Sequence, residues 1–256
     1  MTPAKHKNLL ELRDVTIRFG GVTAVRNLSM DIPKESIVGL IGPNGAGKTT
    51  VFNLITGFYR PNEGFIRFRD RDITGLPPHR ICSKGISRTF QNIRLFANES
   101  ALENIMIGCH VRRKSSWWMM PLLIPSCVQE EKTIRETAWK LLETMGLEQY
   151  ANMPAVSLPY GAQRRLEIAR ALATEPSLLL LDEPAAGMNP QESTELMDFI
   201  RHIRKEYELT ILLIEHDMKV VMGVCEHLWV LEYGQCIASG TPDEIQKNPK
   251  VIEAYL

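Results

Sequence analysis

The chain contains 256 residues, which is long enough to bury a core as one large α/β unit or as a core with an inserted subdomain. Its 30 Lys and Arg residues balance its 30 Asp and Glu residues, so the formal charge is zero and the basic excess typical of nucleic-acid-binding proteins is absent. Hydrophobic residues make up 44% and charged residues 23% of the chain, a globular composition that argues against disorder.

The predicted secondary structure begins with segments that alternate apolar and polar residues. This alternation at Leu9–Phe19 and Gly64–Asp72 predicts antiparallel strands with one solvent-exposed face. Short apolar runs further along the chain predict strands that are buried on both faces, namely Ile37–Ile41, Leu178–Leu181 and Thr210–Ile214. At the end of the chain a hairpin is predicted from Leu228–Leu231 and Cys236–Ala238, and a short helix is predicted to start at Thr241–Pro242.

The middle of the chain differs, because residues 98–174 show helical patterns and no convincing strand. In Glu130–Met145 the apolar residues recur every three or four positions, which gives a helix one apolar face. The pattern therefore predicts a single domain over residues 1–256. Its core would be formed by residues 1–97 and 175–256, and residues 98–174 would be an inserted helical subdomain.

Neither a membrane span nor an export signal is predicted. The longest apolar stretch, Trp117–Pro125, has nine residues and is interrupted by proline, whereas a helix needs about 20 apolar residues to cross a bilayer. Charged side chains run through the first fifteen residues, where a secretory signal would have an apolar core. The widely spaced cysteines predict no zinc site or disulfide framework and suit a reducing compartment: Cys82, Cys109, Cys127, Cys225 and Cys236.

The strongest motif is a phosphate-binding loop of the form G-x-x-x-x-G-K-T. It follows the predicted strand Ile37–Ile41 and leads into a helical segment, Thr49–Thr56, which is the context that the motif requires. Glycine lets the backbone wrap closely, so that N–H groups and the helix N-terminus face phosphate oxygens. Lys48 would contact the β- and γ-phosphates and the Thr49 hydroxyl would bind Mg²⁺, and a glycine-rich turn without a ligand is the alternative. The predicted binding residues are Gly42, Pro43, Asn44, Gly45, Ala46, Gly47, Lys48, Thr49 and Thr50.

A second motif lies at the end of the leucine-rich strand, in Leu178–Pro184. Asp182 stands at the carboxyl end of that strand, where ligands gather in parallel sheets, and it would hold Mg²⁺, usually through water. The next residue, Glu183, is placed to take a proton from an attacking water. Strands often end in carboxylates that are only solvated, but the phosphate loop on the same chain favours the functional interpretation.

The segment Leu158–Leu172 adds a family resemblance, because its sequence LPYGAQRRLEIARAL is similar to the signature segment of ATP-binding-cassette (ABC) ATPases. The resemblance covers almost the whole chain and implies an α/β fold. That fold has a P-loop NTPase core, an antiparallel β subdomain and an inserted α-helical subdomain. It also implies that Phe19 stacks on adenine, that Gln91 contacts Mg²⁺ and joins the core to the insert, and that His216 contacts the γ-phosphate.

The resemblance further implies a head-to-tail pair of cassettes, in which each ATP lies between the phosphate loop of one subunit and the signature of the other. Lys48, Glu183 and His216 would then be the catalytic residues. Catalysis would consist mainly of positioning and charge stabilisation by Lys48, Mg²⁺ and His216, with Glu183 orienting the water.

The signature departs from the family pattern. Pro159 replaces the family serine, Tyr160 the first glycine and Ala162 the glutamine. Proline has no hydroxyl and no N–H to offer a γ-phosphate, whereas Gly161 can still present its N–H. We therefore hypothesise that the site completed by this signature is the weaker one of a pair. Asn189, in place of the usual aspartate of the D-loop, is a milder change.

Further stretches resemble one branch of the family, the larger ATP-binding subunit of bacterial branched-chain amino acid importers. These stretches are Gly42–Phe58, Arg88–Phe96, Asp182–Pro190, Leu213–Met222, Gly240–Pro249 and Val251–Leu256. The resemblance implies a second ATP-binding subunit, identical or related, two membrane permeases, and a periplasmic binding protein that acts indirectly. It places the chain at the cytoplasmic face of the bacterial inner membrane, as a peripheral protein that reaches the membrane only through the permeases.

Three questions stay open at the level of sequence. Importers of urea and other amides use close relatives, and a soluble ABC ATPase without a transporter is the competing class, although such proteins commonly have two cassettes or long coiled-coil inserts. The cargo is not identified, because it contacts the permease and the binding protein. The apolar segment Lys114–Cys127 either packs inside the helical subdomain or forms an exposed patch for a membrane-embedded partner or the lipid interface.

Overall fold

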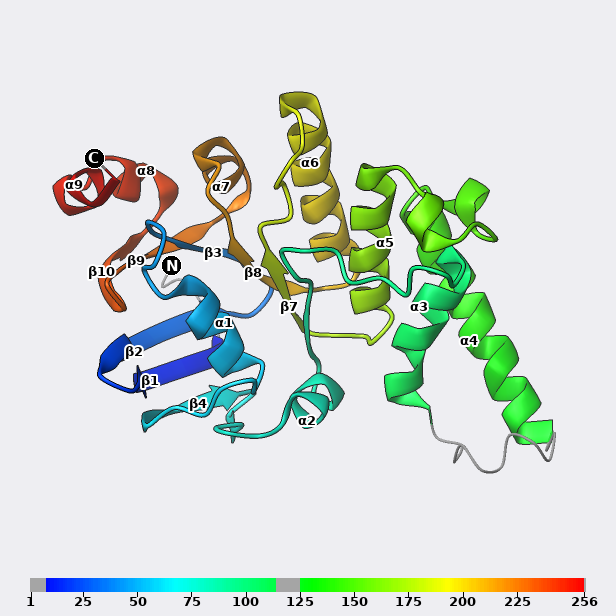
Figure 1. Ribbon diagram of the computed structural model, residues 1–256, viewed down its shortest axis with the longest axis horizontal. Coiled ribbons are helices and arrows are strands. Elements are labelled where there is room, and N and C mark those ends of the chain that lie inside the picture. The colour runs from blue at the N-terminus through cyan, green and yellow to red at the C-terminus, as the bar shows by residue number, and fades with distance from the viewer. Residues whose placement is uncertain (1–7, 114–124, 256) are drawn as a thin grey trace, which may run out of the picture. The chain divides into compact units, whose positions relative to one another are not determined.

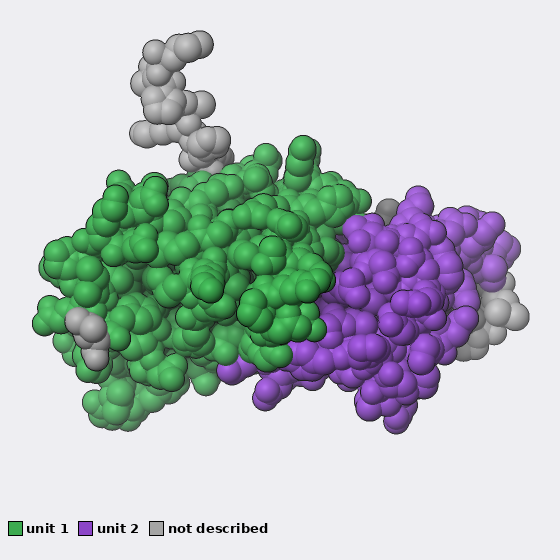
Figure 2. All heavy atoms as spheres, turned by 90° about the horizontal axis from the view of Figure 1, so that it is seen from above, with its two compact units in different colours: residues 1–81, 177–256 green, residues 82–176 purple. Residues whose placement is uncertain are grey.

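The computed structural model describes residues 8–113 and 125–255, which form two compact units. The first unit comprises residues 1–81 and 177–256, and the second comprises residues 82–176. Figure 2 shows the first unit in green and the second in purple. The contacts assign residues 82–97 to the second unit, and the functional boundary at residue 98 stays a prediction.

The first unit contains an antiparallel sheet with the strand order β2-β1-β4-β5 (Figure 1). Its strands are β1 (Asn8–Phe19), β2 (Val22–Pro33), β4 (Glu63–Phe68) and β5 (Arg71–Asp72). The alternating pattern of β1 is confirmed, but the segment predicted at Gly64–Asp72 is two strands. Arg69 and Asp70 separate them because both have left-handed backbone, with φ of 51° and 59°. Strand β2 was not predicted, although its buried Leu28, Met30 and Ile32 alternate with polar residues.

The strands of the second sheet that belong to this unit have the order β10-β9-β3-β8-β7. These strands are β3 (Ile37–Ile41), β7 (Leu178–Asp182), β8 (Thr210–Ile214), β9 (His227–Glu232) and β10 (Gln235–Gly240). Every residue of β3, β7 and β8 is buried, and these strands pair in parallel. The three buried strands and the closing hairpin are therefore confirmed.

The helices of the first unit are α1 (Lys48–Ile55), α6 (Pro190–Glu206), α7 (Met218–Val224), α8 (Pro242–Gln246) and α9 (Pro249–Tyr255), while α2 (Pro78–Ser83) ends within the second unit. Helices α1, α6 and α7 each follow one of the parallel strands β3, β7 and β8. The helix start at Thr241 is confirmed. The Thr241 side chain accepts from the Glu244 N–H and the Glu244 side chain accepts in return, so both ends of a capping box are present.

The second unit is built around packed helices. Its elements are β6 (Ile86–Arg88), α3 (Ala101–Cys109), η1 (His110–Arg112), α4 (Pro125–Thr144), η3 (Glu148–Tyr150), η4 (Ala155–Ser157) and α5 (Tyr160–Leu172). Helix α4 confirms the amphipathic pattern, because Ile134, Ala138 and Leu142 are buried. Helices α3 and α5 approach closely at Gly108, where a Cβ would lie 2.4 Å from the Arg170 carbonyl oxygen. Among the described residues of 98–174 there is no strand, as predicted.

No helix within residues 8–113 or 125–255 is both long enough and apolar enough to cross a membrane. The part of the apolar segment at residues 114–124 lies outside the described residues, so its two interpretations stay predictions. All five cysteines lie within the described residues, and each is a free thiol.

Candidate active site

Three parallel strands bring the predicted motifs to one edge of the sheet. Leu40 of β3 pairs with Ile214 of β8, and Ile214 pairs with Asp182 of β7. The phosphate loop, Asp182 and the residues after Ile214 therefore all lie at carboxyl ends of neighbouring strands, where ligands bind in parallel sheets. The Glu183 N–H extends this alignment by donating to the Ile214 carbonyl oxygen at 2.9 Å.

The phosphate loop has a backbone that requires glycine at its two ends. Gly42 has φ of 150° and Gly47 has φ of 102°. A Cβ would lie 2.1 Å from the Leu231 carbonyl oxygen at Gly42, and 2.7 Å from the Ala24 carbonyl oxygen at Gly47. Gly47 is also the N-cap of α1 and supplies no side-chain hydrogen bond, so the first N–H groups of this helix are left for an anion.

Lys48 is buried in the loop that it follows. Its Nζ donates to the carbonyl oxygens of Gly42 at 2.7 Å and Pro43 at 3.0 Å. Burial lowers the pKa of the Lys48 ammonium, and the nearby negative charges of Glu183 and Asp182 oppose that shift. A poorly solvated cation held by two carbonyl dipoles is suited to a strongly charged anion such as a polyphosphate.

Asp182, Glu183 and His216 come together at the ends of β7 and β8. The Asp182 side chain is buried, and Glu183 has left-handed backbone with φ of 48°. Glu183 Oε1 lies 2.7 Å from His216 Nε2, and both side chains are partly exposed. Such a pair can accept a proton from water at the carboxylate while the imidazole fixes the orientation of that carboxylate.

Glu215 is a further residue at this edge that the sequence prediction did not include. Its side chain is buried, and it accepts from the Ala185 N–H at 2.7 Å and the His216 N–H at 3.1 Å. Burial raises the pKa of the Glu215 carboxyl, although backbone hydrogen bonds oppose the shift. The available signal was an acid directly after the buried strand Thr210–Ile214.

Phe19 lies at the end of β1 with 45% of its surface exposed. Its ring packs edge-on against Tyr59, with 5.0 Å between centroids and 68° between planes. Asn62 ties the loop that contains Tyr59 to β1, because its N–H donates to the Thr16 carbonyl oxygen and its Oδ1 accepts from the Arg18 N–H. The exposed face of Phe19 can therefore stack on a planar ligand, and Tyr59 was not foreseen.

Two of the predicted residues, Gln91 and Gly161, belong to the second unit. Arg164 of α5 donates to the Gln91 carbonyl oxygen at 2.9 Å and so anchors the glutamine segment. Gly161 is the second residue of α5, and nothing lies within 4 Å of the position that its Cβ would take. Pro159 is the N-cap of α5 and provides no side-chain hydrogen bond, so the substitution predicted to weaken the signature also leaves this helix uncapped.

Asn189 has a structural role at the start of α6. Its side chain accepts from the N–H groups of Gln191 and Glu192, and the Glu192 side chain accepts from the Asn189 N–H. Asparagine and aspartate serve almost equally well at an N-cap. The replacement of the family aspartate therefore preserves the local fold.

A divalent cation at this edge of the sheet would need ligands in addition to protein side chains. Within the described residues, no group of three or more His, Cys, Asp or Glu is arranged to hold a metal ion. Mg²⁺ is usually bound by one or two carboxylates together with phosphate oxygens and water. The buried carboxylate of Asp182 and the Thr49 hydroxyl at the start of α1 fit that kind of site.

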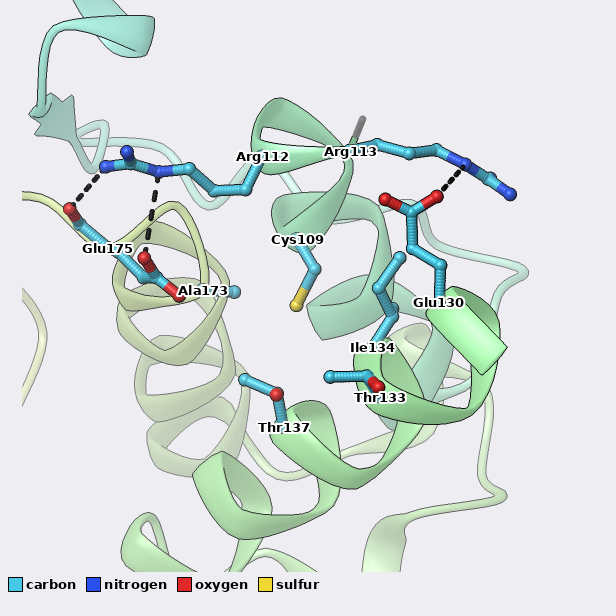
Figure 3. Close-up of a pocket in the computed structure, with 9 residues that line it drawn as sticks. All are labelled: Cys109, Arg112, Arg113, Glu130, Thr133, Ile134, Thr137, Ala173 and Glu175. Atoms are coloured by element: carbon cyan, nitrogen blue, oxygen red, sulfur yellow. Dashed lines mark hydrogen bonds and ion pairs between the residues drawn. The ribbon is translucent and has the colours of Figure 1, made fainter. Parts of the chain in front are cut away.

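A cavity of about 160 Å³ lies elsewhere, within the second unit. Figure 3 shows that its charged side chains pair with one another. Arg112 lies 3.9 Å from a Glu175 carboxylate oxygen, and Arg113 lies 3.6 Å from a Glu130 carboxylate oxygen. The cavity is lined by none of the predicted site residues and is not the candidate site.

Comparison with known proteins places this chain in a family. The ABC transporter family matches residues 25–186, and the family described as branched-chain amino acid ATP-binding cassette transporter matches residues 235–256. The chain belongs to the ABC transporter family. Within that family it is an ATP-binding subunit, and therefore a nucleotide-binding ATPase.

Two curated relatives span the same length. The high-affinity branched-chain amino acid transport ATP-binding protein BraF of Pseudomonas aeruginosa is 46% identical over 248 residues, which cover 97% of each chain. LivG of Escherichia coli (strain K12), which has the same description, is 48% identical over 250 residues, again covering 97% of each. The resemblance inferred from the signature segment and the longer stretches is thereby confirmed.

Solved structures confirm the predicted ABC ATPase fold. An ATP-binding cassette of an ABC transporter in its ADP conformation matches with a TM-score of 0.85 and 32% identity, covering 97% of this chain and 98% of that one. A nucleotide-free cassette matches with a TM-score of 0.84 and 31% identity, covering 98% and 99%.

Proposed function

We propose that this chain binds ATP with Mg²⁺ and hydrolyses ATP to drive an importer of branched-chain amino acids. The observation that supports this most strongly is the meeting of Lys48, Asp182 and the Glu183–His216 pair at one sheet edge. The relatives that cover 97% of the chain are described as branched-chain amino acid transport proteins, which favours this cargo over urea or other amides and favours a transporter over a soluble ATPase.

Nucleotide binding is assigned to the predicted binding residues. The N–H groups of the phosphate loop and of the first turn of α1 wrap the phosphates, and Lys48 contacts the β- and γ-phosphates. Phe19 stacks on adenine with its exposed face, while Tyr59 supports the ring from its edge. When bound, Mg²⁺ neutralises part of the phosphate charge, and Thr49, Asp182 and Gln91 are the residues that would hold it.

Hydrolysis is assigned to Glu183 and His216. Glu183 accepts a proton from the water whose oxygen attacks the γ-phosphorus, while the bond from that phosphorus to the bridging oxygen of ADP breaks. His216 contacts the γ-phosphate and, through its 2.7 Å hydrogen bond, holds the Glu183 carboxylate in place. Lys48 stabilises the charge that develops on the phosphate oxygens.

The remaining assignments concern the assembly. A second ATP-binding subunit, identical or related, binds head to tail, so that Gly161 of one subunit faces the nucleotide of the other. Two permeases carry the cargo through the membrane, a periplasmic binding protein delivers it, and this chain lies at the cytoplasmic face of the inner membrane. ATP binding closes the pair and hydrolysis releases it, which is a contact switch governed by the γ-phosphate.

The Glu183→Gln variant tests the catalytic assignment. Mg²⁺-ATP should raise its thermal unfolding midpoint as it does for the parent, while ATP turnover should fall by about 100-fold or more because the proton acceptor is lost. Glu226→Gln is the matched control, since Glu226 is exposed and pairs with Arg204 at 3.4 Å. Turnover near the parental rate in Glu183→Gln would show that the proton acceptor is another group.

An uptake experiment tests the cargo. Cells without their own branched-chain amino acid uptake would express this chain together with its cognate permeases and binding protein. Uptake of labelled leucine that requires Glu183 supports the proposal. Uptake of labelled urea without uptake of leucine would show that the cargo is urea, and it would leave the ATPase assignment unchanged.

A further inference from the structure

Glu215 is an acid at the candidate active site whose carboxylate is held by backbone N–H groups. One carboxylate oxygen accepts from the Ala185 N–H at 2.7 Å, and the other accepts from the His216 N–H at 3.1 Å. The residue is 4% exposed. Backbone hydrogen bonds, including one from Asp217, oppose the effect of burial on its pKa, so backbone N–H groups take the place of a counter-cation.

The two donors belong to different segments that both serve the site. Ala185 lies in the connection between β7 and α6, two residues after Glu183, whereas His216 follows β8. A carboxylate is rigid and planar, so its two oxygens hold both N–H groups at a set separation. A movement of the His216 backbone therefore carries the Ala185 backbone with it.

This position is an unfavourable one for a carboxylate. Desolvation disfavours the charged form of Glu215, and so does the neighbouring negative charge of Glu183. A residue that served only the stability of the fold would be better replaced by an apolar side chain, because buried charges seldom stabilise a protein relative to good packing. An acid at this position is therefore better explained by a task in the reaction cycle than by a contribution to stability.

We propose that Glu215 is a positioning residue that couples His216 to the Pro184–Met188 segment before α6. The proposal rests on the function proposed above, in which His216 contacts the γ-phosphate. When His216 makes that contact, Glu215 orders the segment that follows the catalytic Glu183. Loss of the γ-phosphate releases His216, and the segment before α6 loses the same restraint.

The Glu215→Gln variant tests this role because it keeps the size of the side chain. One oxygen can still accept a hydrogen bond, but the new NH₂ group faces a second N–H donor. We expect kcat for ATP hydrolysis to fall by about ten-fold or more, the affinity for Mg²⁺-ATP to stay within about three-fold of the parent, and the thermal midpoint to stay within a few degrees. Glu226→Gln, which removes an exposed carboxylate, should leave all three unchanged.

Hydrogen exchange separates coupling from simple support of the fold. The Glu183→Gln variant should bind ATP without turnover. In this variant, Mg²⁺-ATP should slow hydrogen exchange in two peptides, a first that covers residues 42–50 and a second that covers residues 184–189. In the double variant Glu183→Gln/Glu215→Gln, the first peptide should keep its protection and the second should lose it. The double variant Glu183→Gln/Glu226→Gln should retain both.

Each remaining outcome overturns the proposal in a distinguishable way. Full protection of residues 184–189 in the double variant, with parental kcat in Glu215→Gln, would show that Glu215 couples nothing. Loss of both protections with a large fall in the thermal midpoint would show that Glu215 only holds the fold together. Absence of protection at residues 42–50 in Glu183→Gln itself would refute the nucleotide site, and the coupling with it.

Discussion

The glutamine segment is held by a buried ion pair whose removal should be costly. On α5, Arg164 and Glu167 are 0% and 1% exposed, and Arg164 donates to Glu167 at 2.9 Å. Arg164 also donates to the carbonyl oxygens of Phe90 and Gln91 at 2.8 and 2.9 Å. Glu167 accepts in turn from the Phe90 N–H at 3.3 Å. The pair thus fastens the chain around Gln91 to the signature helix.

Replacing Arg164 by Met leaves the Glu167 carboxylate buried with only backbone N–H groups for compensation. Breaking a buried pair in this way costs about 3–5 kcal/mol. For a chain of this size, about 2 °C of unfolding midpoint corresponds to 1 kcal/mol, so the midpoint should fall by roughly 6–10 °C. The double variant Arg164→Met/Glu167→Leu removes both charges, and it should be more stable than Arg164→Met alone because the two sites are coupled.

Urea unfolding followed by circular dichroism measures these free energies, and ATP turnover of the folded variants reports on Gln91. The reasoning would fail if Arg164→Met unfolded at the parental urea concentration. It would also fail if the double variant lost as much stability as the two single variants together, because the cost would then come from packing and not from an uncompensated charge. Arg135→Met on α4 is a control for removal of an arginine from the same unit without a described buried partner.

Three further predictions concern caps and thiols. Pro159→Ser should stabilise the start of α5 by about 1 kcal/mol and raise the ATPase rate of the assembled complex. The control variant Pro159→Ala should do neither. An unchanged or lower ATPase rate for Pro159→Ser would contradict the hypothesis that this signature completes the weaker site. Asn189→Ala should cost about 1 kcal/mol in urea unfolding because the α6 capping box is lost, and Asn189→Asp should cost little; equal losses would exclude a capping role. Burial raises the pKa of the Cys109 thiol to about 11 and that of the Cys225 thiol to about 12. At pH 8 both thiols are therefore protonated, and they should resist iodoacetamide until the protein unfolds. Rapid labelling of either thiol in mass spectra of the native protein would contradict this.

The chemistry at the sheet edge could be predicted because its signals are local. The phosphate loop is a contiguous run between a strand and a helix, and Asp182 and Glu183 directly follow a strand of leucines. Parallel strands align their carboxyl ends, so motifs that are far apart in sequence must meet there. The predicted strands Ile37–Ile41 and Thr210–Ile214 therefore located most of the site before any contact was known.

The missed elements had weaker or ambiguous local signals. Strand β2 contains the polar residues Arg26, Asn27 and Ser29. These residues interrupt the alternation of apolar and polar positions that would predict a strand. The break between β4 and β5 depends on left-handed backbone at Arg69 and Asp70, neither of which is glycine. Such conformations are set by the pairing of the flanking strands and leave little trace in composition.

The sequence by itself determined that the chain is an ABC ATPase and where its phosphate loop and its Asp182–Glu183 pair lie. Each of these motifs consists of consecutive residues, so it can be identified without knowledge of the fold. Only the tertiary structure decided that Glu183 meets His216, that Tyr59 supports Phe19, and that Glu215 bridges two loops. Those contacts join residues far apart in the chain, and their geometry depends on strand register and burial, which act only once the sheet has formed.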